Sequence, residues 1–263
     1  MNPMPKWIRL LVPALIALAA LLAWEAVVRV REIPAYLIPA PSLVLQTLVS
    51  DWPTLWPSLL VTLKITFLSL LLAVVGGVAL AFLFSLSSWV ELSFVPFAVV
   101  LQVTPIIAIA PLILIYAPNT LTALLLCAWI VAFFPILSNT TMGLRSADRN
   151  LQDLFSLYGA SRWQRLRYLL APSAMPYFLA GLKIAGGLSL IGTVAAEYAA
   201  GTSGKESGLA YRILEASFRL NMPRMFAALL LVALTGISIY FAFNALSRAL
   251  LHKWHESELD ASR

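Results

Sequence analysis

The chain has 263 residues, of which 61% are apolar and only 11% are charged, and its mean hydropathy is +0.88. A soluble domain usually carries about 25% charged residues, so this chain has too few of them to cover the surface of a water-exposed globule. The composition excludes an ordinary soluble domain and predicts an all-α integral membrane protein. The net charge of +6 does not indicate nucleic-acid binding, because the basic residues are dispersed at the ends of apolar segments.

Six segments are apolar enough to cross a bilayer, since a spanning helix needs about 20 mostly apolar residues. The first is interpreted as an uncleaved span and not as a signal peptide, because Glu25 follows it without a clean cleavage site. The fifth is extended back past Lys183, on the expectation that this lysine reaches the interface from the end of the span. Within a single domain of residues 1–263, the spans are expected at about 10–28, 65–87, 93–116, 121–141, 177–199 and 225–248.

The basic residues of the connecting segments predict the orientation. Ten Lys and Arg residues fall on the side of the N-terminus and six fall on the other side, and basic residues favour the cytoplasmic face. Both termini are therefore expected in the cytoplasm. Pro105 and Pro111 fall within the third span, and such breaks are tolerated where the backbone faces protein or a water-filled path. These two prolines favour a transporter and are candidates for its path or gate.

No metal site is expected, because the only histidines, His252 and His255, lie in the polar C-terminal tail and a metal site needs three or four ligands. The single cysteine, Cys127, cannot form an intramolecular disulfide. No paired carboxylates and no Ser/His/Asp set lie within the spans, so catalysis by the chain itself is not expected. A secondary transporter is the alternative function, although the spans hold few of the carboxylates that would bind a coupling ion.

The largest hydrophilic loop on the expected cytoplasmic side, residues 143–176, is predicted to form two short helices between spans four and five. The first carries an apolar face, Gly159 ends it, and Ser161 begins the second with Gln164 in a capping box. Pro172 is expected to limit the second helix. The residues that share the apolar face are Leu151, Leu154, Phe155 and Tyr158. This face either packs on its own bundle or is presented to a groove on a soluble partner, and periodicity does not decide between the two.

The segment DLFSLYGASRWQRLRYLLAPSAMP resembles the cytoplasmic signature loop of binding-protein-dependent ABC importer permeases. That signature is Glu-Ala-Ala, three residues, Gly, nine residues, Ile, one residue and Leu-Pro. Asp153, Leu154 and Phe155 occupy the Glu-Ala-Ala positions, and Gly159 and Pro172 fall in register. Further segments occur in family order over residues 33–255 and most resemble the nitrate, sulfonate and taurine branch, which also includes transporters of vitamin precursors. They are IPAPSLVL, VTPIIAIAPLILIYA, FFPILSNTTMGL, GLKIAGG, VAAEY, SGLAYRILEAS and HKW.

The resemblance implies a permease subunit in a bacterial inner membrane, working by alternating access. Two copies would form the path, two cytoplasmic ATPase subunits would drive it, and a separate binding protein would deliver a small organic or inorganic solute. The chain lacks a GxxxxGK[ST] loop, so ATP would be bound by the partner and the permease would need no cofactor. The residues implied to contact the ATPase are Asp153, Leu154, Phe155, Tyr158, Gly159, Ala160, Ser161 and Pro172.

Glu197 is expected at membrane depth in the outer half of span five, where an acidic group is costly. It lines the path or gate in one interpretation, and in the other it is a structural residue with an arginine of the 205–224 segment as its partner. Two outward-facing stretches are open to two interpretations, namely residues 203–222 and Pro41–Val49. They either receive the binding protein or form an outer gate, or they lie on the bilayer as interfacial helices. The path is expected to carry little fixed positive charge, so the sequence does not specifically indicate small anions as solutes.

Overall fold

The structure, a computed structural model, describes residues 6–201 and 207–251, and this part of the chain is helical without strands. The prediction of an all-α membrane protein is confirmed. The helices are α1 (Lys6–Val30), α2 (Pro41–Ser50), α3 (Trp52–Leu86), α4 (Ser88–Val103), α5 (Ile106–Tyr116), α6 (Thr120–Arg145), α7 (Arg149–Leu157), α8 (Arg162–Arg165), the π-helical turn η1 (Leu166–Leu170), α9 (Ala171–Ala200), α10 (Leu209–Phe218) and α11 (Met222–Leu251).

Five of the described helical segments are long and apolar enough to cross a membrane, and the bent pair α4–α5 makes six if it counts as one span. The third expected span, 93–116, is therefore divided, because α4 and α5 meet at 105°. The physical cause is Pro105, which has no N–H to donate and keeps the preceding residue out of the helical region. Thr104 and Pro105 have extended ψ angles of 123° and 111°.

Two other spans are longer than the sequence predicts. The second begins at Trp52 and not near residue 65, so it includes Lys64. The fifth runs without interruption from Arg162 through η1 and α9 to Ala200. Lys183 consequently lies well inside this span and not near its end, and its Nζ donates to Asn244 Oδ1 of α11 at 3.1 Å.

The expectation that Pro172 limits the second short helix is wrong. Pro172 stands in the first turn of α9, and the helix continues through it. A proline inside a helix clashes with the carbonyl group four residues earlier. The carbonyl four residues before Pro172 is that of Tyr168, which lies in the π-helical turn η1. A π-helical turn has i→i+5 hydrogen bonds and is wider than an α-helical one, so it can accommodate the proline ring.

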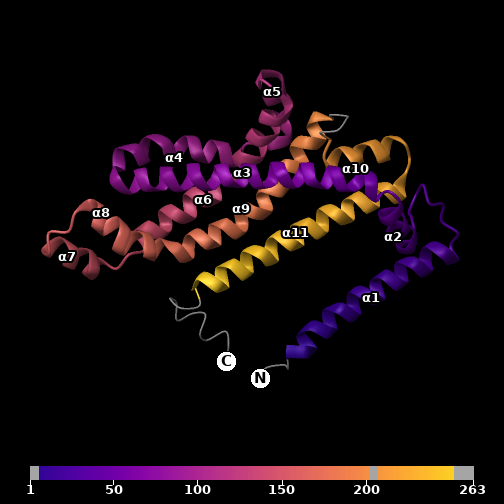
Figure 1. Cartoon of the computed structure of the whole chain (residues 1–263), viewed down its shortest axis with the longest axis horizontal. Coiled ribbons are helices and arrows are strands. Elements are labelled where there is room, and N and C mark those ends of the chain that lie inside the picture. Colours follow the sequence, from indigo (N-terminus) through magenta and orange to yellow (C-terminus); the bar gives the residue numbers. More distant parts are fainter. Residues whose placement is uncertain (1–5, 202–206, 252–263) are drawn as a thin grey trace.

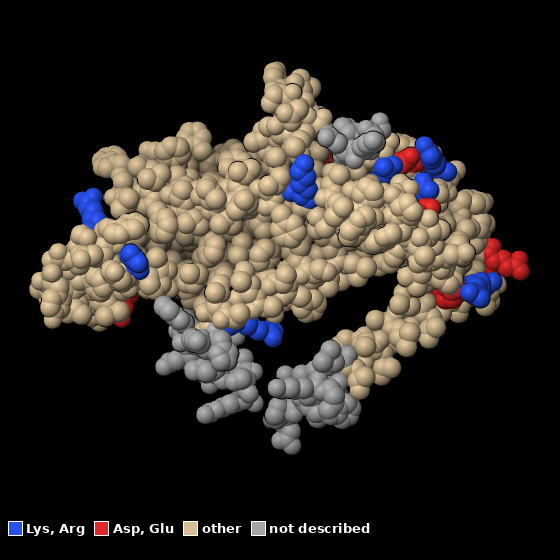
Figure 2. All heavy atoms as spheres, viewed as in Figure 1, with Lys and Arg blue, Asp and Glu red and all other residues tan. Residues whose placement is uncertain are grey.

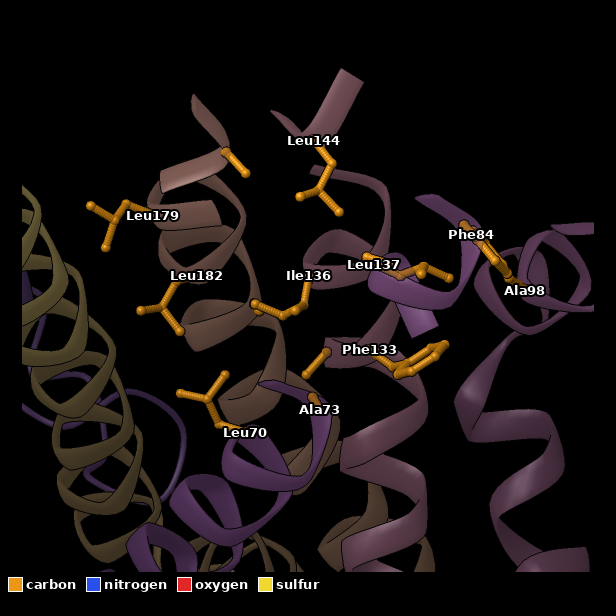
Figure 3. Close-up of a cluster of buried hydrophobic side chains, with 14 of the residues drawn as sticks. Leu70, Ala73, Phe84, Ala98, Phe133, Ile136, Leu137, Leu144, Leu179 and Leu182 are labelled. Atoms are coloured by element: carbon orange, nitrogen blue, oxygen red, sulfur yellow. The ribbon is translucent and has the colours of Figure 1, made fainter. Parts of the chain in front are cut away.

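Helices α3, α6 and α9 pack most extensively and form the centre of the bundle. Figure 3 shows the largest cluster of buried apolar side chains, in which residues of α3, α6 and α9 meet. Glycines allow these helices to approach closely. A Cβ added to Gly77 would lie 2.8 Å from Ile136 Cγ2, and one added to Gly192 would lie 2.9 Å from Ala128 Cα. Small residues at the contact allow the backbone approach that membrane helices need.

The bundle has two distinct ends (Figure 1). The α7–α8 hairpin projects at one end, and α2 and α10 lie together at the other. Helix α1 is the least buried of the spans, with 6% of its apolar window buried against 28–50% in the other four continuous spans. On the face seen in Figure 2, charged side chains gather toward the ends and the middle is mostly uncharged.

The α6–α9 contact predicts different outcomes for two glycines of one helix. Gly192→Ala should lower the free energy of unfolding by about 1–3 kcal/mol, because its methyl group meets the backbone of α6. Gly187→Ala is the matched control, since its Cβ would have no atom within 4 Å and alanine favours helix. Thermal unfolding of the two purified variants measures the difference. Equal unfolding temperatures would contradict the close packing described.

Candidate functional site

A row of hydrogen-bonding side chains lies buried between α3 and α9, and we call it the polar seam. Residues four apart share one face of a helix, so the seam residues of α9 recur on the face that meets α3. Each is at most 2% exposed. The seam consists of Ser58, Thr62, Thr66 and Ser69 of α3 and Ser189, Thr193 and Glu197 of α9.

The seam side chains pair in antiparallel order. The hydroxyl oxygens of Ser69 and Ser189 are 2.9 Å apart, and the Ser189 hydroxyl also donates to the Thr66 carbonyl oxygen at 2.6 Å. The Thr66 hydroxyl donates to Thr193 Oγ1 at 3.2 Å. At the end of the seam, Thr62 Oγ1 donates to Glu197 Oε1 at 2.8 Å. The seam therefore fixes the register of α3 against α9.

Glu197 connects the seam to the beginning of α10. The Ala210 N–H donates to Glu197 Oε2 at 3.1 Å, and the Leu209 N–H donates to Thr62 Oγ1 at 2.9 Å. These two N–H groups belong to the first turn of α10, whose N-cap residue, Gly208, has no side chain to satisfy them. A carboxylate at this position is stabilised by the helix dipole. Glu197 and Thr62 thus cap α10 from two other helices.

The fit between Glu197 and α10 leaves no room for a side chain on Gly208. A Cβ at this position would lie 2.0 Å from Glu197 Oε1 and 2.1 Å from its Cδ. Glycine is therefore required here by the close approach of the carboxylate to the backbone.

The expected arginine partner of Glu197 is not found, because no ion pair among the described residues includes Glu197. Arg212 instead donates to Ser58 Oγ at 2.9 Å and pairs with Glu215 at 3.0 Å. Arg224 pairs with Asp51 at 2.5 Å. These contacts form a charged layer that ties α10 and α11 to the beginning of α3. The carboxylate is held by hydrogen bonds at a helix terminus.

The α7–α8 hairpin forms as the sequence predicts. Gly159 has a φ of +65° and ends the first helix in the left-handed conformation. Ser161 and Gln164 complete the capping box that begins α8. The Arg165 side chain donates to Ser156 Oγ at 2.7 Å, so a direct contact fixes the angle between the two helices.

The hairpin presents apolar side chains to its surroundings and does not bury them on its own bundle. Tyr158 is 83% exposed and Leu154 is 44% exposed, while Phe155 is half-buried. Asp153 is also exposed. The structure places residues 153–161 together in the hairpin, and Pro172 lies apart from them in α9. The interpretation in which the apolar face packs internally is therefore not supported.

The two prolines predicted for the path lie on either side of the contact that α5 makes with the seam helices. Pro105 is the N-cap of α5 and Pro111 lies within it. Between them, Ala110 belongs to a buried cluster that also contains Ile65 of α3 and Ala196 of α9. Ala196 is the neighbour of Glu197, so the broken span and the end of the seam meet at one level of the bundle.

Two features of the site were not predicted. One is an ion pair between Glu91 of α4 and Arg145 of α6, which crosses an open groove of about 520 Å³ near the hairpin. The other is the seam. Its sequence signal is the recurrence of Ser and Thr at intervals of four, four and three in α3 and four and four in α9, which places hydroxyls on single helix faces. His252 and His255 lie outside the described residues.

The sequence of the spans and hairpin matches a known family over more than half of the chain. Residues 73–252 match the binding-protein-dependent transport system inner membrane component. The chain belongs to this family. It is therefore a multi-pass permease of the inner membrane and part of an ABC transport system, which supplies a separate ATPase and a solute-binding protein. The permease is not itself the ATP-hydrolysing enzyme.

Individual permeases are similar over nearly their whole lengths. A probable ABC transporter permease of Haemophilus influenzae is 32% identical, with 94% of this chain and 98% of the relative covered. A riboflavin transport permease of Chloroflexus aurantiacus is 33% identical, with 96% and 92% covered. A taurine transport permease of Escherichia coli is 28% identical, with 90% and 88% covered. The predicted nitrate, sulfonate and taurine branch is confirmed.

The permease fold is also found in a crystal structure described as an amino acid ABC transporter with histidines. The TM-score is 0.64 at 20% identity, and the match covers 78% of this permease and 97% of that chain. This likeness shows that the two permeases share a fold.

A double-mutant cycle tests the contact between Glu197 and α10. Gly208→Ala should lower the free energy of unfolding by about 1–3 kcal/mol, because the new methyl group overlaps the carboxylate. Glu197→Ala should cost about 1.5–3 kcal/mol through the lost charged hydrogen bonds. In the double variant the methyl group has room. The double variant should therefore lose less stability than the sum of the two single losses, by about 1 kcal/mol or more. Unfolding of the purified variants in detergent measures all three values, and strict additivity would contradict the contact.

Proposed function

We propose that two copies of this permease form an alternating-access path and that two ATPase subunits drive it through the α7–α8 hairpins. The observation that carries this proposal is the hairpin itself, which projects from the end of the bundle (Figure 1). It carries exposed apolar side chains. An amphipathic helix of this kind fits an apolar groove on a partner. We place this end, and both termini, in the cytoplasm.

The proposed docking surface consists of the α7 face and the turn that follows it. The aromatic side chain of Tyr158 would enter the ATPase groove, since exposed aromatic residues commonly supply much of the binding energy at an interface. Asp153 would lie at the polar rim, and Gly159 and Ser161 would set the direction of the second helix. The members of this surface are Asp153, Leu154, Phe155, Tyr158, Gly159, Ala160 and Ser161. Pro172 would act indirectly, through the start of α9.

The uninterrupted helix from Arg162 to Ala200 supplies the mechanical connection. Its 39 residues correspond to roughly 58 Å of helix, so a displacement of the hairpin reaches the opposite end of the bundle. ATP binding would close the ATPase dimer and carry the two hairpins with it. The spans would then rock as packed units between inward-open and outward-open states.

Glu197 and the two prolines of the broken span would form the outer gate. Movement of α9 relative to α3 would separate Glu197 and Thr62, which together hold the first turn of α10. Pro105 and Pro111 would let α5 move against the same region, because a broken helix lacks the rigidity of a continuous one. Opening the gate would admit solute from the binding protein docked near α2 and α10.

The solute would be a small organic or inorganic compound. The relatives named for riboflavin and taurine differ in their solutes, and selectivity in such a system would reside largely in the binding protein. The proposal therefore covers the nitrate, sulfonate, taurine and vitamin-precursor group as a whole.

Tyr158→Asp should reduce the ATPase captured with the tagged permease by roughly tenfold or more, because losing a central aromatic contact costs about 2 kcal/mol. Tyr158 is 83% exposed, so the change should leave folding and membrane insertion intact. Co-purification from detergent-solubilised membranes measures the effect. Capture of equal ATPase by wild type and variant would count against the proposed docking surface.

A matched pair at Gly159 tests whether the turn geometry couples the hairpin to transport. Valine is strained at a positive φ, by about 1–2 kcal/mol, whereas asparagine tolerates it. A Cβ here has no atom within 4 Å, so neither variant clashes. Gly159→Val should abolish solute uptake by the reconstituted complex while ATP hydrolysis continues, and Gly159→Asn should retain uptake. Normal uptake with the valine variant would show that the geometry of the Gly159 turn does not couple the hairpin to transport.

A further inference from the structure

Lys64 is the only charged residue in the 35 residues of α3. It is exposed, and it forms no hydrogen bond or ion pair with any of the described residues. It lies within an apolar exposed stripe in which Leu60 is 46%, Phe67 is 50% and Leu68 is 39% exposed. Lys183 and Glu197, two other charged residues inside the spans, both have polar partners.

The position of Lys64 along α3 places it deep in the membrane. Trp52 and Trp56 stack at 5.3 Å near the beginning of the helix and are both partly exposed, as is typical of aromatic residues at the membrane interface. Lys64 follows Trp56 by eight residues, which is roughly 12 Å of helix in a hydrocarbon core of about 30 Å. A lysine at this depth faces protein or water and not lipid, because a charge in hydrocarbon is costly.

A second observation concerns the surroundings of Lys64. Ile65, its neighbour on the helix, belongs to a buried cluster. Val61, one turn away, and Ile106, the first residue of α5, are partly buried and pack against that cluster. The break at Thr104–Pro105 is therefore at the same level as Lys64. Gln102, a polar residue next to the break, is exposed. Irregular backbone at membrane depth is tolerated where it lines a water-filled cavity or is buried in protein.

We infer that Lys64 lies in the water-filled translocation path beside the broken span and makes that path selective for anionic solutes, such as carboxylates, sulfonates or phosphates. This inference rests on the proposed function and narrows its solute class. It differs from the expectation that the path carries little fixed positive charge. In a symmetric pair of permeases, two lysines would face the same path, and the low-dielectric walls of the path would focus their field.

The charge at Lys64 is measurable without knowing the solute. The probe is a cysteine at Leu68, one helical turn from Lys64, in the full chain in membrane vesicles with the native Cys127 replaced by alanine. Two water-soluble methanethiosulfonate reagents are compared, the anionic sulfonatoethyl compound and the cationic trimethylammonium-ethyl compound. A unit charge about 6 Å away in water changes each rate roughly threefold in opposite directions. Lys64→Gln should therefore lower the anionic-to-cationic rate ratio roughly tenfold, and Lys64→Arg should preserve it.

Leu18→Cys, at an exposed position in the middle of α1, is the control for reagent that arrives through lipid. Faster reaction at Leu68→Cys than at Leu18→Cys, together with the change in ratio, supports the inference. Reaction at Leu68→Cys no faster than at Leu18→Cys would overturn the water-filled setting. Equal ratios in wild-type and Lys64→Gln backgrounds would overturn the anion selectivity. The reagents need no ATPase, so these outcomes are independent of whether the hairpin captures one.

Discussion

Hydrogen bonds between α3 and α9 are the constraint on which the rest of this permease depends. Lipid is as apolar as leucine, so burial of apolar side chains gives membrane helices little reason to associate. Close packing at glycines and paired polar side chains supply the attraction instead. In this chain both act on the same helices, since Gly192 approaches α6 while Ser189, Thr193 and Glu197 bond to α3. A change of register would leave several polar groups unsatisfied at once, and each would be costly in hydrocarbon.

Helix α9 connects the two ends of the molecule, and the seam holds it against α3. Helix α9 begins beside the hairpin, where η1 lets the chain pass Pro172 without a break. It ends beside α10, where Glu197 accepts the Ala210 N–H. The residues that meet at this end come from α3, α9 and α10, and Thr62 of α3 is 135 residues from Glu197 in the sequence. Gly208 belongs to this arrangement because a larger residue would displace the carboxylate.

Local patterns predicted much of this structure, and long-range contacts accounted for what they missed. The Gly159 turn and the capping box at Ser161 depend on neighbouring residues alone, and both were predicted correctly. The continuation of the helix through Pro172 was not, because it depends on a π-helical turn with no simple sequence signal. The partners of Glu197 were also missed. One of the two interpretations gave it an arginine, whereas the carboxylate accepts hydrogen bonds from Thr62 and from the backbone of a helix packed against it.

The connection between the hairpin and α10 is tested most directly by amide hydrogen exchange in residues 207–218 of the permease–ATPase complex in lipid, with and without a non-hydrolysable ATP analogue. We expect the analogue to speed exchange at Leu209 and Ala210, because movement of α9 would separate these amides from Thr62 and Glu197. The increase should disappear in Gly159→Val, which disturbs the hairpin at the opposite end. Unchanged exchange in the wild-type complex, with nucleotide binding verified, would contradict the claim that the hairpin and the α10 gate are mechanically connected.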